Sequence, residues 1–228
     1  MNKTILALDT TNLEEAIDIT KKIKNKIFTV KLGLEFFNAH GKKGIQKFNE
    51  IGIDNLMLDL KLKDIPNTVY KSIKALEGIK FGYLTVHGQG GKVMIDSAKK
   101  AAKEIKSKPK IMMVTILTAL NDNDLEYMGM NNTVNEQVKI LAKIAKEMDV
   151  GVVCSGHEAK SVRKILGPNN LIFTPGIRIA NENANDQQRV CTPSESLLNG
   201  ADKIIMGRSL TNGDIVENLN KVSKSIKT

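Results

Sequence analysis

Short apolar segments alternate with longer amphipathic segments along almost the whole chain, and this pattern most constrains the fold. Strands that alternate with helices form βαβ units and a parallel sheet. The predicted strands cover residues 4–8, 27–31, 55–60, 82–87, 111–116, 150–154, 171–174 and 203–206. The predicted helices cover residues 12–24, 34–50, 66–77, 91–106, 134–148, 157–166, 193–199 and 212–225.

Eight such units in 228 residues predict one domain over residues 1–228, folded as a (β/α)8 TIM barrel, with a doubly wound open sheet as the alternative. No Pro-, Gly- or Ser-rich linker divides the chain. Polar residues at the strand ends favour the barrel, because the carboxyl ends of its strands meet at one mouth. They are Asp9, Lys31, Asp59 with Lys61, His87, Thr115 to Thr118, Ser155, Thr174 with Arg178, and Gly207 with Arg208.

Composition narrows the class of protein. The net charge of +9 would suit nucleic-acid binding, but the lysines are spread over helical faces. Aromatic residues make up 4% and Trp is absent, which leaves no platform for stacked bases. The chain has no apolar run of the roughly 18 residues needed to span a membrane, and no signal-peptide pattern. We therefore expect a cytoplasmic protein that binds neither nucleic acid nor membrane.

Asp59, Lys61 and Asp64 are the most informative charged residues. Leucines alternate with Asp59 and Lys61, so a β-strand would place both charged side chains on one face. Such alternation also fits a surface edge strand. However, Pro66 suits the first turn of a helix, so the strand runs into a βα loop. A buried Lys beside carboxylates is costly unless paired, and such groups gather at functional sites.

Two segments predict a phosphate site. Gly207 and Arg208 follow the last strand, and Thr174 to Arg178 follow the strand before it and open a long polar segment that contains Gln187. Barrel phosphate sites are formed by these loops. The alternatives are an ordinary Gly turn and a mobile surface loop. The chain has only four Arg among its many Lys, Arg163, Arg178, Arg189 and Arg208, which suggests a need for the planar guanidinium fork.

Other motifs are weaker. His87 and the glycines after it lack the spacing of a phosphate-binding loop, and we expect His87 to be structural. Ser155 and His157 lack the GxSxG motif of a hydrolase. Cys154 and Cys191 show no metal-ligand spacing, so we expect reduced cysteines, with Cys154 in the core, and no metal site.

In combination, the motifs resemble those of bacterial orotidine 5′-monophosphate decarboxylases. They are Asp59-x-Lys61-x-x-Asp64 followed by Ile65 to Thr68, Thr174 to Arg178, Asp186-Gln187 and Gly207-Arg208. Further matches extend over the chain at 6–9, 30–33, 86–87, 90–91, 117–118 and 152–155. The resemblance implies a homodimer of (β/α)8 barrels with active sites at the interface. It also implies conversion of orotidine 5′-monophosphate to UMP and CO₂ without a cofactor or metal.

The resemblance also implies roles for individual residues. Lys31, Asp59 and Lys61 would form a charge array that Asp64 of the other subunit completes, and Lys61 would stabilise and protonate a carbanion at C6. Asp9 would bind the ribose, and Thr118, with Thr115 as the alternative, would contact the pyrimidine. Arg178, Gln187, Gly207 and Arg208 would hold the phosphate. Two rivals are a Mg²⁺-dependent sugar-phosphate lyase or decarboxylase and an inactive barrel that binds nucleic acid.

Overall fold

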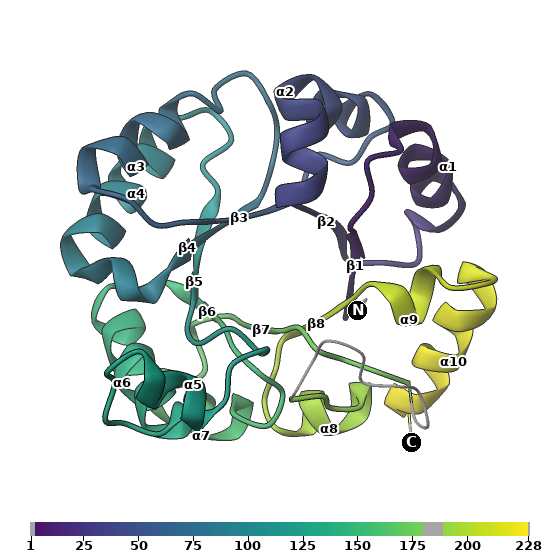
Figure 1. The fold of residues 1–228 in the computed structure, drawn as a ribbon. Coiled ribbons are helices and arrows are strands. Elements are labelled where there is room, and N and C mark those ends of the chain that lie inside the picture. The colour runs from purple at the N-terminus through teal and green to yellow at the C-terminus, as the bar shows by residue number, and fades with distance from the viewer. Residues whose placement is uncertain (1–2, 180–188, 228) are drawn as a thin grey trace.

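The chain forms a closed barrel of eight parallel strands, in which β1 pairs with both β2 and β8 (Figure 1). This computed structural model describes residues 3–179 and 189–227. The strands are β1 (Thr4–Leu8), β2 (Thr29–Gly33), β3 (Met57–Leu62), β4 (Tyr83–His87), β5 (Lys110–Val114), β6 (Gly151–Val153), β7 (Ile172–Thr174) and β8 (Lys203–Met206). The predicted TIM barrel is confirmed, and the open-sheet alternative is wrong.

The helices surround the barrel, and each predicted helix has a counterpart. These are α1 (Leu13–Ile23), α2 (Leu34–Glu50), α3 (Pro66–Lys74), α4 (Gly91–Glu104), α6 (Val134–Glu147), α7 (Ala159–Leu166), α8 (Pro193–Leu198) and α10 (Ile215–Lys227). None of the helices in the described ranges is long and apolar enough to cross a membrane.

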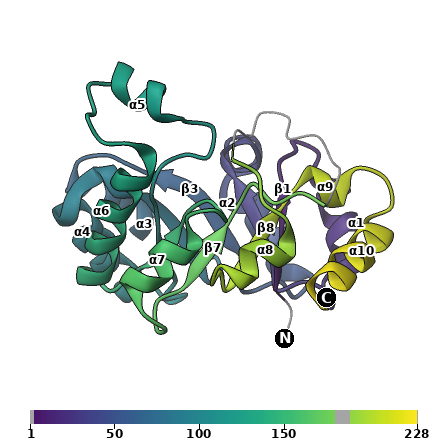
Figure 2. The same cartoon turned by 90° about the horizontal axis from the view of Figure 1, so that it is seen from below.

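Three short elements were missed by the sequence analysis: η1 (Gly88–Gly90), α5 (Asp122–Tyr127) and α9 (Arg208–Thr211). They are too short for helical periodicity to be recognised. Helix α5 is polar and depends on a capping box between Asn121 and Asp124, and it stands clear of the ring of helices (Figure 2). The helix expected over residues 212–225 is α10, which begins at Ile215, and α9 precedes it directly after Gly207.

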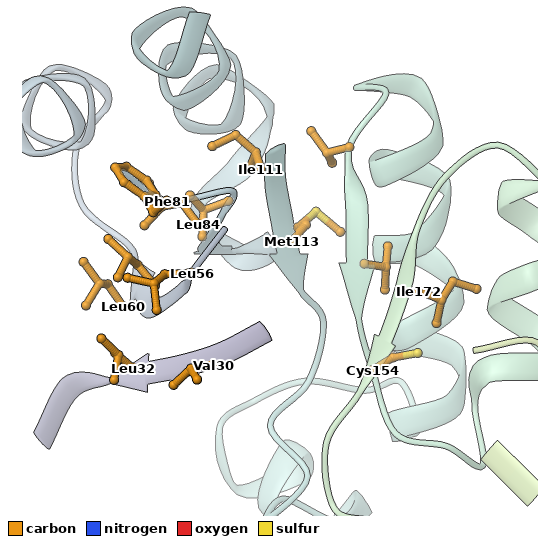
Figure 3. Packing of buried hydrophobic residues seen from close by; sticks show 14 of the residues in the cluster. Val30, Leu32, Leu56, Leu60, Phe81, Leu84, Ile111, Met113, Cys154 and Ile172 are labelled. Carbon is orange, nitrogen blue, oxygen red and sulfur yellow. The ribbon is translucent and has the colours of Figure 1, made fainter. Parts of the chain in front are cut away.

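Alternate residues of each strand face opposite sides of the sheet. The outward side chains pack against the helices, and Figure 3 shows part of this cluster, which includes Cys154 as predicted. The inward side chains form a separate cluster, in which Tyr83 of β4 and Phe173 of β7 meet across the barrel with ring centroids 5.1 Å apart. The same alternation continues to Asp9, directly after β1, and to Asp59 on β3. The inward positions are thus apolar at one end of the barrel and polar at the carboxyl end.

Two predicted strands are displaced by about two residues. The prediction had 27–31 and 55–60, whereas β2 and β3 extend to Gly33 and Leu62. Strand ends are set by pairing with neighbours, while the prediction followed hydrophobicity alone. In β3 the register with β4 is irregular between Leu58 and Leu62, a feature that bears directly on Lys61.

Candidate active site

Charged side chains from three adjacent strands meet at the carboxyl end of the barrel. Asp59 Oδ2 accepts hydrogen bonds from Lys61 Nζ at 2.8 Å and from Lys31 Nζ at 3.2 Å. Lys31 Nζ also donates to Asp9 Oδ1 at 3.3 Å. Cations and anions therefore alternate from Asp9 to Lys61. The structure brings together four of the predicted site residues in one ion-pair network.

The network stabilises the charged forms of its buried members. Burial acts to raise the pKa of Asp59, but the ammonium groups of Lys31 and Lys61 and the hydrogen bonds to the carboxylate hold it at about 2. Burial acts to lower the pKa of Lys31, but the carboxylates of Asp59 and Asp9 outweigh it, so the pKa is raised above its ordinary value. Asp59 and Lys31 are therefore both ionised at neutral pH.

The backbone at Lys61 adopts an unusual conformation. Lys61 has φ of 46°, in the left-handed region that a residue with a side chain seldom occupies. Its N–H donates to Thr85 Oγ1 at 2.8 Å, and the same hydroxyl donates to Asp59 Oδ1 at 2.9 Å. Thr85 thus supports both the strained backbone and the carboxylate that binds the Lys61 ammonium. Strain of this kind persists only where surrounding contacts over-determine it.

Gly33 permits the close approach of β1 and β2 side chains. A Cβ at this position would lie 3.1 Å from Asp9 Oδ1 and 3.4 Å from Lys31 Nζ. The separation from Asp9 is tighter than ordinary van der Waals contact, so a larger residue would displace the Asp9 carboxylate. Glycine here keeps the ion pair between Asp9 and Lys31.

The network faces a cavity of about 710 Å³ at the same end of the barrel. Eight predicted site residues line this cavity: Asp9, Lys31, Asp59, Lys61, Thr118, Arg178, Gly207 and Arg208. About a third of the Lys61 side chain is exposed, against about a tenth for Lys31. Lys61 is therefore the ammonium that is open to a bound molecule, while Lys31 lies beneath it.

The predicted phosphate-binding residues also lie on this cavity. Arg178 is buried, and its Nη1 donates to Ile177 O at 3.0 Å. Arg208 is the first residue of α9, directly after Gly207. A Cβ added to Gly207 would meet no protein atom closer than 3.6 Å, so crowding within the protein does not explain this glycine. Its backbone instead leaves space in the cavity beside two guanidinium groups.

The family described as "Orotidine 5'-phosphate decarboxylase / HUMPS family" matches residues 2–221. The chain belongs to this family. The membership predicted from the motifs is confirmed.

Individual members of the orotidine 5'-phosphate decarboxylase / HUMPS family are similar over nearly the whole chain. The orotidine 5'-phosphate decarboxylase of Sphingopyxis alaskensis is 41% identical over 90% of this chain and 90% of its own. That of Ehrlichia canis is 39% identical over 99% of this chain and 98% of its own. The crystal structure of the Lactobacillus acidophilus enzyme has a TM-score of 0.85 at 34% identity and covers 100% of both chains.

The predicted roles of Asp64 and Gln187 have no support from the cavity lining among the described residues. Asp64 is exposed and lies outside the cavity lining, and its Oδ1 accepts from the N–H of Ile65 at 2.7 Å. Gln187 lies outside the described residues. Their predicted roles stay predictions.

Two further predicted assignments concern residues near the site. Thr115 is buried and its hydroxyl donates to Val153 O at 3.2 Å, whereas Thr118 lines the cavity. The geometry therefore favours Thr118 over Thr115 as the hydroxyl that could meet a ligand. His87 Nδ1 accepts from Gln89 N–H at 3.4 Å and caps η1, as expected of a structural histidine.

Sequence reasoning missed Thr85 and Glu35. Thr85 occupies the inward position between Tyr83 and His87, so counting alternate residues along β4 would have found it. Glu35 also lines the cavity, two residues beyond Gly33 and in the first turn of α2. Within residues 3–179 and 189–227, no three His, Cys, Asp or Glu side chains gather as metal ligands would. A reaction without metal stays a prediction.

Proposed function

We propose that this protein converts orotidine 5′-monophosphate to UMP and CO₂, the last step of de novo pyrimidine synthesis. The observation that carries the proposal is the buried Asp59, which binds two ammonium groups at the edge of the cavity. The similar proteins named orotidine 5'-phosphate decarboxylase support the same substrate. The cavity is large enough for a nucleotide, with the ion-pair network and the two arginines on its lining.

Lys61 performs the central step in this proposal. Loss of CO₂ from C6 of the pyrimidine leaves a carbanion that the ring delocalises poorly, and a fixed ammonium stabilises the charge where it develops. Lys61 then donates a proton to C6. Asp59 orients the Lys61 ammonium through the 2.8 Å hydrogen bond. The Lys31 ammonium also binds the Asp59 carboxylate and balances its buried negative charge. The left-handed backbone at Lys61 supports this fixed placement.

Binding energy comes from contacts remote from C6. Arg178, Arg208 and the Gly207 backbone hold the 5′-phosphate, with Gln187 as a further contact outside the described residues. Asp9 binds the ribose and Thr118 the pyrimidine. Contacts of this kind allow binding energy at the phosphate to be used for orientation at the reacting carbon.

The direct test is the loss of orotate absorbance when the protein is added to orotidine 5′-monophosphate in EDTA. The proposal expects turnover without added metal. Activity that is abolished by EDTA and restored by Mg²⁺ would instead favour the sugar-phosphate chemistry of the rival. Complete absence of turnover by a folded protein would exclude the decarboxylase.

We also propose that the active unit is a homodimer in which Asp64 completes the charge array of the partner's site. The exposure of Asp64 supports this, since its carboxylate is absent from the lining of its own cavity. The neighbouring Ile65 is 67% exposed, as an apolar residue at an unformed interface would be. Mixing inactive Asp64→Ala with inactive Lys61→Ala protein should restore activity through hybrid dimers. No recovery despite demonstrated subunit exchange would contradict the shared site.

We further propose that the protein acts in the cytoplasm without binding nucleic acid. Some surface lysines pair with carboxylates of the same helix, as in Lys47 with Glu50 and Lys221 with Glu217, which offsets part of the positive charge on these helices. Tight, salt-sensitive binding of oligonucleotides would contradict this proposal.

A further inference from the structure

The guanidinium of Arg189 joins two segments that are distant in the chain. Its Nη2 donates to Leu117 O at 2.8 Å and to Ile116 O at 3.3 Å, and its Nη1 donates to the carboxylate of Glu158. Only 17% of the Arg189 side chain and 8% of the Glu158 side chain are exposed. A buried fork that meets a carboxylate and two carbonyls holds these groups in one geometry.

Both ends of this contact are anchored to the barrel. Glu158 Oε2 accepts from the N–H of Ser155 at 3.0 Å, directly after β6. On the other side, Cys191 follows Arg189 closely, and its carbonyl accepts from Arg178 N–H at 3.0 Å. The Arg189 guanidinium is therefore a fixed point, and the Ile116–Leu117 backbone is attached to it.

The attached backbone belongs to the cavity wall. Residues Ile116, Leu117, Thr118 and Ala119 all line the cavity, whereas neither Arg189 nor Glu158 does. Among the described residues, the side-chain hydrogen bonds of Arg189 reach the cavity wall at this loop. The carbonyls that it binds directly precede Thr118, so their position determines where the Thr118 hydroxyl lies.

We propose that Arg189, held by Glu158, is a positioning residue that sets the 116–119 loop for recognition of the pyrimidine base. The inference rests on the proposed function, in which Thr118 contacts the base. Loss of the pair should loosen this wall of the cavity and leave the network around Asp59 unchanged. The effect should therefore fall on ligands that carry a base.

The test compares UMP with ribose 5-phosphate, which lacks the base, by titration calorimetry. Replacing Arg189 alone would leave Glu158 buried without its cation, so the variant is the double substitution Arg189→Met with Glu158→Gln. We expect the Kd of UMP to rise about tenfold or more and that of ribose 5-phosphate to change less than twofold. Arg189→Lys keeps the charge but loses the fork, and should restore part of the UMP affinity.

A matched pair at the other end of the barrel provides the control. Arg163 Nη2 donates to Asp202 Oδ2 at 2.6 Å, and its Nη1 donates to Asn170 O at 2.8 Å. Arg163→Met with Asp202→Asn removes a similar set of bonds away from the cavity. It should lower the melting temperature while the Kd of UMP stays within twofold of the wild-type value.

Three outcomes overturn the inference. One is a folded Arg189/Glu158 double variant with wild-type affinity for UMP. Another is equal weakening of UMP and ribose 5-phosphate, which would place the effect on the phosphate rather than the base. The third is loss of UMP affinity in the Arg163/Asp202 control. General destabilisation of the protein would then explain the weaker UMP binding of the Arg189/Glu158 variant. A wild-type protein that binds no UMP contradicts the proposed function itself.

Discussion

Each end of the barrel interior contains a buried lysine, but the pKa values of the two lysines shift in opposite directions. At the carboxyl end, burial alone would lower the pKa of Lys31, but the carboxylates of Asp59 and Asp9 raise it. At the amino end, burial lowers the pKa of Lys203, Lys3 lowers it further, and Asp202 offsets only part of this. Lys203 Nζ instead lies 3.9 Å from the centroid of the Phe28 ring.

The opposite pKa shifts of Lys31 and Lys203 distinguish an end of the barrel suited to catalysis from an end that is filled by packing. The amino end is filled by Phe28, Tyr83 and Phe173 in mutual ring contact, so Lys203 closes an aromatic cluster. The carboxyl end places its lysines beside carboxylates and an open cavity. In barrel enzymes the carboxyl end carries the reaction and the opposite end carries stability. Four predictions test whether this division holds.

The largest effect should come from Lys61. Lys61→Ala removes the ammonium that faces the cavity, and we expect turnover to fall by about 10³-fold or more, because a preorganised charge acts mainly on the transition state. The affinity for UMP should change little. Lys203→Met is the control at the amino end. It should keep turnover within about twofold of wild type, because Lys203 does not line the cavity. Steady-state decarboxylation and UMP titration measure both quantities, and near-normal turnover of Lys61→Ala would refute its role.

The second prediction concerns the acid stability of Asp59. Its folded-state pKa of about 2 lies below the ordinary value of 3.8, so its contribution is complete above pH 3.8 and is lost as the pH falls through 2. Between pH 6 and pH 2 the wild type should therefore lose about 2 kcal/mol more stability than Asp59→Asn. Urea unfolding of both proteins across this range measures the difference. The contributions of the other carboxylates are the same in both proteins and cancel in the comparison. A pH-independent difference would mean that the ion-pair network does not lower this pKa.

The fold and most of the site could be predicted from the sequence, for identifiable reasons. Period-two alternation and regular spacing of strands are local properties, so the barrel and the shared face of Asp59 and Lys61 followed from them. The polar strand ends likewise indicated Asp9, Arg178 and Arg208, because a closed barrel brings such ends together.

What could not be predicted depends on contacts between distant residues. The left-handed backbone at Lys61 is stabilised by Thr85, which is 24 residues away in the chain. The contact of Arg189 with Leu117 O spans 72 residues. Neither Thr nor Arg has a local pattern that identifies its partner. Likewise, Asp64 is absent from the lining of its own cavity, so its predicted role depends on a second subunit.

The third prediction tests Thr85 as the support of the reaction centre. Thr85→Val keeps the shape but removes the hydroxyl that donates to Asp59 and accepts from Lys61 N–H. We expect turnover to fall about tenfold, since hydrogen bonds to charged groups contribute roughly 1.5–3 kcal/mol. Thr29→Val is the control, because its buried hydroxyl donates to Asn55 O at the amino end. That variant should lose stability and keep turnover. Equal turnover in the two variants would show that the carboxyl end of the barrel contributes no more to the reaction than the amino end.

The smallest effect compares the two buried lysines directly in alkaline solution. Because the folded pKa of Lys203 lies below 10.5, its buried charge opposes folding below that pKa, and this cost disappears as the pH rises towards 10.5. The stability of Lys203→Met relative to wild type should therefore decline between pH 8 and pH 10.5. The folded pKa of Lys31 lies above 10.5, so its stabilising effect is complete throughout this interval and Lys31→Met should show no such trend. Parallel urea titrations test this. The same dependence of relative stability on pH in both variants would show that a buried ammonium has the same effect on folding at the two ends of the barrel.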